Sequence, residues 1–174
     1  SNAEITKRAD ELNRLFKKYD TYIGNAVEKH GVDKNLIKAV MFKESSGIPD
    51  QVSSLGAVGL MQIKPDTASE LAGREVSVEE LKQPELNIDL GTKYIKQLLD
   101  IFDYEELSLA AYNWGQGNVR QNCRDTFNSC KHIPKETSDY VELVSKYRNY
   151  LDINEGKFVA GSDGEAREIK TGSL

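Results

Sequence analysis

The sequence lacks any run of about 20 apolar residues, the length that a membrane-spanning helix needs, and its N-terminus lacks the pattern of a signal peptide. It also lacks a basic excess, since 28 acidic residues outnumber 23 basic ones and the formal charge is −5. We therefore expect no membrane segment and no nucleic-acid partner. Ser1, Asn2 and Ala3 match the remnant of a cleaved tag, so we expect that an export signal was removed.

Cysteine is scarce: only Cys123 and Cys130 occur, with six mostly polar residues between them. A loop of this length can bring the two thiols together, and closing it would stabilise the fold by about 2 to 3 kcal/mol. A disulfide would indicate an oxidising compartment, whereas two free thiols are the alternative. A zinc site with His132 would be one ligand short of a closed structural set, so we expect no metal.

The hydrophobic periodicity is helical almost throughout, and 174 residues with 39% hydrophobic content suffice for one core. An N-terminal apolar stripe predicts a long packing helix that ends near Gly31. Its members are Ile5, Ala9, Leu12, Phe16, Tyr19 and Ile23. Further helices are predicted over 33–45, 65–71, 84–102, 105–113 and 137–151. We therefore expect an all-α, single-domain fold with an N-terminal packing helix.

Composition divides the chain into three segments. Residues 1–31 comprise the tag remnant and the N-terminal helix, residues 32–151 a helical domain, and residues 152–174 a polar, Gly-rich tail. Within the tail, residues 161–164 would turn a small hairpin, or the tail is a linker to a missing neighbour. The N-terminal stripe is too short for a sustained coiled coil, so we expect a monomer.

Glu44 is the residue that most needs an explanation. It follows the apolar residues Ile37, Val40 and Met41 by seven, four and three positions, which places its carboxyl group on the apolar side of a helix. Glu is rarely buried without a partner. Burial and the negative end of the helix would both raise the pKa of Glu44 above about 4.3, so that it holds a proton near neutral pH.

The helix that carries Glu44 has clear end signals. Asp33 is a good N-cap, and Gly47 with Pro49 beyond it predicts the stop. Glu44 therefore lies in the last turn, where a loop begins. Two other interpretations remain open: a basic side chain neutralises Glu44, or the helix frays before it and leaves it solvated.

Four sequence blocks share an order and spacing that point to one family. They are Glu44-Ser45; Ser53 with Gly56-Ala57-Val58-Gly59-Leu60-Met61-Gln62; Ala111-Tyr112-Asn113-Trp114-Gly115-Gln116-Gly117; and Ile133-Pro134 with Glu136-Thr137 and Tyr140-Val141. Together they resemble the soluble-type lytic transglycosylases, lysozyme-like enzymes that cut the glycan strands of bacterial cell walls. The resemblance implies a lysozyme-like catalytic domain over residues 32–151.

The resemblance also implies that Glu44 is the catalytic acid and base. Glu44 would protonate the oxygen between N-acetylmuramic acid and N-acetylglucosamine, then deprotonate the muramoyl 6-hydroxyl, which closes a 1,6-anhydro ring. No second catalytic carboxylate is evident, because Asp50 and Asp66 are read as a loop residue and a residue of a helix first turn. The reaction needs no cofactor.

Six further residues are implied to bind substrate: Ser53, Met61, Gln62, Tyr112, Asn113 and Tyr140. Met61 is either an apolar wall of the site or a core residue. Asn113 is alternatively a helix C-cap. Tyr140 either places its hydroxyl near Glu44 or packs in the core, and Trp114 is a secondary candidate for stacking on a sugar.

We therefore expect a cofactor-free peptidoglycan lytic transglycosylase that acts on glycan strands outside the cytoplasm. One alternative is a hydrolytic muramidase, which would need a positioned water and a second carboxylate. The other is a non-catalytic cell-wall-binding module that keeps the cleft without the activity.

Overall fold

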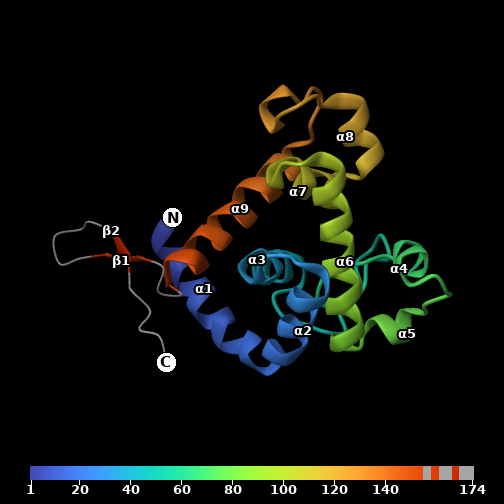
Figure 1. The fold of residues 1–174 in the computed structure, drawn as a ribbon, viewed down its shortest axis with the longest axis horizontal. Coiled ribbons are helices and arrows are strands. Elements are labelled where there is room, and N and C mark those ends of the chain that lie inside the picture. The colour runs from blue at the N-terminus through green and yellow to red at the C-terminus, as the bar shows by residue number, and fades with distance from the viewer. Residues whose placement is uncertain (155–157, 161–165, 169–174) are drawn as a thin grey trace.

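The computed structural model describes residues 1–154, 158–160 and 166–168, and the described chain is mostly helical, as predicted (Figure 1). The α-helices are α1 Asn2–Phe16, α2 Asp20–His30, α3 Lys34–Ser45, α4 Pro65–Ala72, α5 Val78–Leu81, α6 Pro84–Phe102, α7 Glu105–Trp114, α8 Gln116–Asn122 and α9 Lys135–Asp152. Short 3-10 helices span Lys17–Tyr19 and Phe127–Ser129. No helix in the described ranges combines the length and hydrophobicity that crossing a bilayer requires.

Helix α3 is the centre of the fold. Figure 1 looks along α3, which lies inside a ring formed by α1, α2, α6, α7 and α9. All residues from 35 to 42 are buried, including Lys38, so the helix is enclosed on every side rather than along one stripe. Full burial of side chains such as Ile37 and Met41 contributes about 1.5 to 3 kcal/mol each. Packing against the surrounding helices therefore fixes the position of α3 and of its C-terminal end.

The predicted N-terminal helix is wrong in one respect, because it is broken by the 3-10 turn at Lys17–Tyr19. Phe16 and Tyr19 are buried at the break. The change of direction lets α1 pack against α9 while α2 packs against α6, which a straight helix would not allow. The side chain of Leu12 lies outside the described part. Helix α2 ends at Gly31 in the left-handed conformation, as expected.

Both ends of α3 have defined caps. The Asp33 side chain accepts a hydrogen bond of 2.7 Å from the backbone N–H of Asn35. At the other end Ser46, with φ 52°, is the first left-handed residue, and Gly47 follows with φ 80°. The helix therefore ends at Ser45, as predicted, and its left-handed C-cap is Ser46 rather than Gly47. The side chain of Ser45 supports the turn by accepting a hydrogen bond from the N–H of Gly47.

Two short helices, α5 and α8, fall where only loops or turns were expected. Helix α5 has four residues, too few for periodicity to reveal, but Ser77 and Glu80 form a capping box at its start. Helix α8 begins directly after Gly115, which ends α7 with φ 97°. Helix α9 begins two residues before the predicted Thr137.

The predicted disulfide is confirmed: Cys123 and Cys130 are bonded, with their Cα atoms 4.0 Å apart. The bond joins the end of α8 to the segment that leads into α9. It closes a small loop beside α7, at the top of Figure 1.

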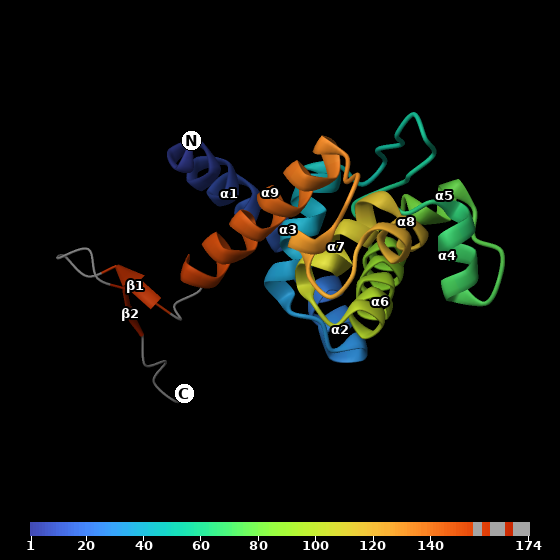
Figure 2. The ribbon, with the colours of Figure 1, turned by 90° about the horizontal axis from the view of Figure 1, so that it is seen from above.

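The tail contains the two strands that flank the predicted hairpin turn. Strand β1, Phe158–Ala160, pairs antiparallel with β2, Ala166–Glu168, and Phe158 lies opposite Glu168. The predicted turn at 161–164 lies outside the described residues. Figure 2 shows that the paired strands lie beyond the end of α9, away from the helical body.

Arg148 ties three helices together. Its guanidinium lies 3.1 Å from Glu105 at the start of α7, 3.9 Å from the α3 cap Asp33, and 3.8 Å from Asp152 at the end of α9. Burial is the main factor that raises the pKa of Glu105, and the charge of Arg148 opposes it. Without the guanidinium, three carboxylates would face one another across a partly buried junction.

We expect Arg148→Ala to lower the free energy of unfolding by about 1 to 2 kcal/mol, because it leaves these carboxylates without their shared counter-ion. Urea denaturation at neutral pH measures the change. The control is Lys146→Ala, which removes the exposed pair between Lys146 and Glu142 on the same helix and should cost less than about 0.5 kcal/mol. Equal losses in the two variants would show that the junction has no special role.

Candidate active site

A cavity of about 500 Å³ opens at the C-terminal end of α3. Its lining comes from the last turn of α3, the loop between α3 and α4, the first turns of α4 and α9, the middle of α6 and the end of α7. Of the residues expected to form a site, the cavity brings together Glu44, Ser53, Gln62, Tyr112 and Asn113. Trp114, the secondary candidate, also lines it. Met61 and Tyr140 do not.

Glu44 is the acid of this cavity. Its carboxyl group is partly accessible through the cavity, while protein atoms surround most of it. Burial raises the pKa of Glu44 from 4.5 to about 7, which agrees with the direction predicted from its helical position. The Tyr140 hydroxyl and the charge of Lys43 lower this pKa, and the charge of Glu136 raises it. Near neutral pH the protonated and ionised forms of Glu44 are therefore both populated.

Tyr140 approaches Glu44 from the core. The ring is buried on α9, and burial followed by the charge of Glu44 raises the pKa of Tyr140 well above its usual value. Its hydroxyl is close enough to lower the pKa of Glu44, yet its oxygen has no hydrogen bond of regular geometry to another described residue. Tyr140 thus offers a neutral hydroxyl to the acid rather than a wall to the cavity.

The loop segment Leu60–Met61 is fixed from α3 and α6. Ser45, next to Glu44, donates a hydrogen bond of 2.7 Å from its hydroxyl to the carbonyl of Leu60. The buried side chain of Asn87 accepts one of 2.8 Å from the N–H of Met61. The same amide donates to the carbonyls of Val58 and Leu81, so three of its four hydrogen bonds are made. The sequence reading missed Asn87, whose only signal is a polar residue on the buried side of a helix.

Tyr112 fixes the same segment from α7. Its hydroxyl donates a hydrogen bond of 2.6 Å to the carbonyl of Met61, and burial raises its pKa well above the usual value. Its ring packs at 5.3 Å from the ring of Tyr94, which also lines the cavity. Tyr94 was not among the residues expected to form a site, because its spacing in the helix predicted over 84–102 is that of a core residue. We call the segment held by Ser45, Asn87 and Tyr112 the Leu60–Met61 anchor.

The side chain of Met61 does not form a wall of the cavity. It is fully buried and packs on Gly91 of α6, where an added Cβ would lie only 2.4 Å from the Met61 sulfur. The expected binding role of Met61 is therefore not supported, and the core interpretation is correct. The Met61 side chain lies in the core because Gly91 of the facing helix leaves a space that the thioether fills.

Ser53 and Gln62 lie on the loop wall of the cavity. Ser53 starts a tight turn in which its hydroxyl oxygen accepts from the N–H of Ala57 at 3.0 Å, so the hydroxyl proton stays available. Gln62 has φ 51°, and its amide nitrogen donates to the carbonyls of Gln51 and Gly59 at 3.0 Å. The amide nitrogen thus stabilises the loop, and its carbonyl oxygen is the group left for a ligand.

Asn113 connects α7 with α9 at the cavity. Its side-chain oxygen accepts a hydrogen bond of 2.8 Å from the hydroxyl of Thr137. The C-cap of α7 is Gly115, so the alternative reading of Asn113 as a helix cap is wrong. The amide nitrogen of Asn113 has no hydrogen bond to another described residue, and Asn113 lines the cavity, so this nitrogen is available there.

A second carboxylate, Glu136, lines the cavity, although none was evident from the sequence. Asp50 and Asp66, the carboxylates nearest to Glu44 in the sequence, do not line it. Glu136 lies in the first turn of α9, one turn before Tyr140, so the two share a helix face. The four-residue spacing between Glu136 and Tyr140 is the sequence signal that could have identified Glu136 as a cavity residue. Within the described ranges, no group of three or more His, Cys, Asp or Glu side chains is placed to hold a metal ion.

Glu44→Gln is expected to stabilise the protein at alkaline pH. Folding raises the pKa of Glu44 from 4.5 to about 7, so the parent loses stability as the pH rises through this window, and the loss is complete above it. The variant avoids this penalty, whose upper limit is about 3 kcal/mol. Urea denaturation should give a higher free energy of unfolding for the variant at about pH 8 and equal values near pH 4. The exposed control Asp50→Asn should show no such gain.

Glu136→Gln is expected to lower the pKa of Glu44, because it removes a negative charge that opposes ionisation of the acid. Carbon-13 NMR titration of the Glu44 carboxyl measures the shift. Glu142→Gln, an exposed change further along α9, is the control and should leave the titration unchanged. An unchanged or higher Glu44 pKa in the Glu136 variant would contradict the placement of the two carboxyls at one cavity.

The chain is similar to known proteins along most of its length. The model of the transglycosylase SLT domain matches residues 21–133. The membrane-bound lytic murein transglycosylase E of Buchnera aphidicola is 40% identical over 93 residues, which are 50% of this chain and 42% of that protein. The membrane-bound lytic murein transglycosylase F 1 of Alkalilimnicola ehrlichii is 32% identical over 158 residues, or 85% of this chain and 30% of that protein.

Solved structures agree with these matches. The 70 kDa soluble lytic transglycosylase of Escherichia coli superposes with a TM-score of 0.71 at 30% identity, over 79% of this chain and 24% of that one. A complex of the 70 kDa soluble lytic transglycosylase with bulgecin A gives a TM-score of 0.72 at 28% identity, over 82% of this chain and 25% of that one. This chain thus spans less than half the length of each of these proteins.

Proposed function

Because the chain belongs to the transglycosylase SLT domain family, we propose that it is a peptidoglycan lytic transglycosylase with Glu44 as its acid and base. The observation that carries the proposal is a carboxyl group with a pKa of about 7 at the edge of a cavity of about 500 Å³. A group with this pKa can both give and take a proton near neutral pH.

The reaction has two proton transfers at Glu44. Protonated Glu44 gives its proton to the oxygen that joins N-acetylmuramic acid to N-acetylglucosamine, and the bond from the muramoyl C1 to that oxygen breaks. The carboxylate then takes the proton of the muramoyl 6-hydroxyl, whose oxygen bonds to C1 and closes the 1,6-anhydro ring. No water is added. The neutral hydroxyl of Tyr140 supports this cycle, since it favours the ionised form of Glu44 that each turnover must pass through.

The polar groups that line the cavity are proposed to position the sugars. The Ser53 hydroxyl proton, the Gln62 carbonyl oxygen and the Asn113 amide nitrogen are the groups that the fold leaves available there. We assign Ser53 to the acetamido group of the reacting sugar, as the family resemblance implies. Tyr112 acts through the Leu60–Met61 anchor, because its hydroxyl is bonded to the Met61 carbonyl.

Hydrolysis is the second candidate function, and Glu136 is the observation that favours it. Most glycosidases use two carboxyl groups at one site, and the second group acts as a base or nucleophile. Glu44 and Glu136 form such a pair at this cavity. Glu136 would then activate a water molecule. In the transglycosylase, Glu136 instead raises the pKa of Glu44 and helps to keep it protonated.

We propose that residues 32–151 contain the catalytic centre, with residues 1–31 as a packing segment and residues 152–174 as a tail. The enzyme would act outside the cytoplasm, where its proposed substrate lies, and the disulfide fits an oxidising compartment. The names of the relatives describe membrane-bound proteins, whose other parts this chain does not match.

Digestion of purified peptidoglycan followed by mass spectrometry tests the function. The wild type should release muropeptides that end in 1,6-anhydro-muramic acid, and Glu44→Gln should reduce release by about 100-fold or more because the proton donor is lost. Asp50→Asn is the matched control and should retain wild-type release, since Asp50 does not line the cavity. Products one water heavier would support the muramidase, and full release by Glu44→Gln would sink the proposal.

A further inference from the structure

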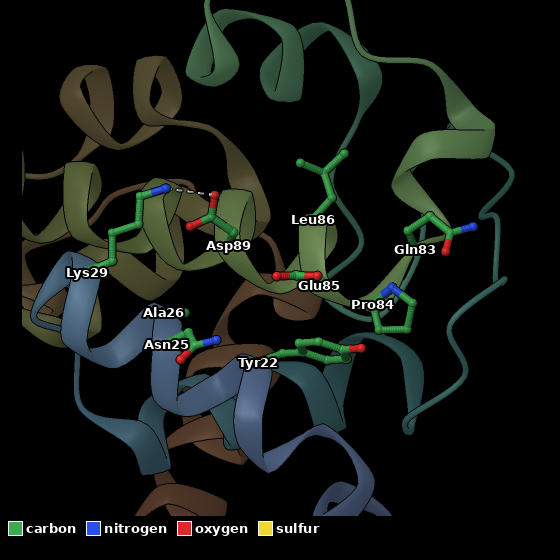
Figure 3. Close-up of a pocket in the computed structure, with 9 residues that line it drawn as sticks. All are labelled: Tyr22, Asn25, Ala26, Lys29, Gln83, Pro84, Glu85, Leu86 and Asp89. Carbon is green, nitrogen blue, oxygen red and sulfur yellow. Dashed lines mark hydrogen bonds and ion pairs between the residues drawn. The ribbon is translucent and has the colours of Figure 1, made fainter.

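A second cavity of about 570 Å³ lies between α2 and the start of α6 (Figure 3). Its lining comprises Tyr22, Asn25, Ala26 and Lys29 of α2 and Gln83, Pro84, Glu85, Leu86 and Asp89 at the start of α6. None of these residues lines the Glu44 cavity. We call this cavity the α2–α6 groove.

Helix α6 separates the two cavities. Glu85 lines the α2–α6 groove, and Tyr94 lines the Glu44 cavity. The two residues are nine positions apart, which corresponds to about two and a half turns, so their side chains leave α6 on opposite sides. The α2–α6 groove therefore cannot be an extension of the Glu44 cavity.

The α2–α6 groove combines an aromatic ring with available polar groups. Tyr22 is partly buried, and Figure 3 shows its ring along one side of the hollow, with Asn25 and Glu85 beside it. The side chains of Asn25, Gln83 and Glu85 make no hydrogen bond or ion pair with any residue that the structure describes. Two amides and a carboxylate are thus free to bind a ligand next to a flat apolar surface.

The charges of the α2–α6 groove disfavour anionic ligands. Asp89 is already paired with Lys29 at 3.3 Å and with His30 at 2.7 Å. Glu85 is the charged side chain of the lining that has no ion pair within the described chain, and its carboxylate repels phosphates and carboxylates. No cluster of three metal-binding side chains occurs here or elsewhere in the described chain. A neutral ligand with many hydrogen-bonding groups fits best.

The surface is also unlike a protein-docking site. Those interfaces centre on exposed apolar anchors. The exposed large apolar residues of the described chain are Leu15, Ile48, Val52, Leu55, Val78, Tyr104 and Ile153, and none of them lines the α2–α6 groove.

We propose that the α2–α6 groove is an accessory site for a glycan strand of N-acetylated sugars, distinct from the strand in the Glu44 cavity. This inference rests on the proposed function, which supplies the polymer. One face of a sugar would stack on the Tyr22 ring, while Asn25, Gln83 and Glu85 would bind hydroxyl and acetamido groups. Because a network of strands can occupy both sites at once, the groove would raise affinity for intact cell wall without affecting short fragments.

Binding and turnover measured on two substrates test the proposal. In a Glu44→Gln background, which leaves the polymer intact, Tyr22→Ala should weaken binding to insoluble peptidoglycan by about tenfold, equivalent to about 1.4 kcal/mol. The double variant Asn25→Ala/Gln83→Ala changes only exposed side chains and should act in the same direction without loss of folding. With Glu44 restored, kcat and KM for a soluble glycan fragment of four sugars should remain within about twofold of the wild type. Tyr104→Ala, an exposed tyrosine that lines neither cavity, is the matched control.

The outcomes separate this site from the proposed function. Unchanged polymer binding in both groove variants would overturn the accessory site, and this is the result expected if the groove binds a protein partner instead. An equal loss on polymer and on fragment would also overturn it. Absence of turnover by the wild type on either substrate would instead contradict the proposed function. Selective loss on the polymer in the groove variants, with the Tyr104 control unaffected, would establish the site.

Discussion

The geometry of the candidate active site depends on the Leu60–Met61 anchor. Hydrogen bonds from three helices converge on these two residues: Ser45 and Tyr112 reach their carbonyls, and Asn87 reaches the N–H of Met61. The acid precedes Ser45 by one residue, so the same contacts that hold the loop also fix its distance from Glu44. These hydrogen bonds are short, and they are buried or, for Tyr112, partly buried. Leaving the polar groups of such a bond unpaired costs more free energy than the bond contributes when it forms.

Close backbone approach makes this anchor possible. Gly59 has φ 80°, and an added Cβ there would lie 2.3 Å from the Asn87 amide and 2.6 Å from the Leu81 carbonyl. A Cβ on Gly91 would collide with the Met61 side chain. The two glycines therefore allow the loop to sit directly on α6. Because the loop is held in place, the cavity stays open on one side of Glu44 while protein atoms surround the rest of its side chain. This partial burial raises the pKa of Glu44.

Sequence patterns were most informative where one physical signal dominates. Helical spacing placed Glu44 on a buried helix end, and the mostly helical, lysozyme-like fold and the disulfide are confirmed. The patterns failed where tertiary contacts decide. The sequence left Met61 open between a wall of the cavity and the core, because the residue that decides is Gly91, 30 positions away, whose lack of a side chain leaves room for Met61 in the core. Glu136 is distant from Glu44 in sequence, and only the packing of α9 against α3 brings its charge to the acid. Likewise, the break between α1 and α2 follows from docking on different helices.

The turn that follows the acid restricts which sequences this fold can use. Ser46 and Gly47 both have left-handed backbone conformations, which β-branched and bulky residues adopt only with strain. Mutational drift at these positions is therefore limited by chain geometry, independently of any ligand. In this chain, a bulky or β-branched side chain at either position would strain the turn that follows Glu44, whichever ligand the cavity holds.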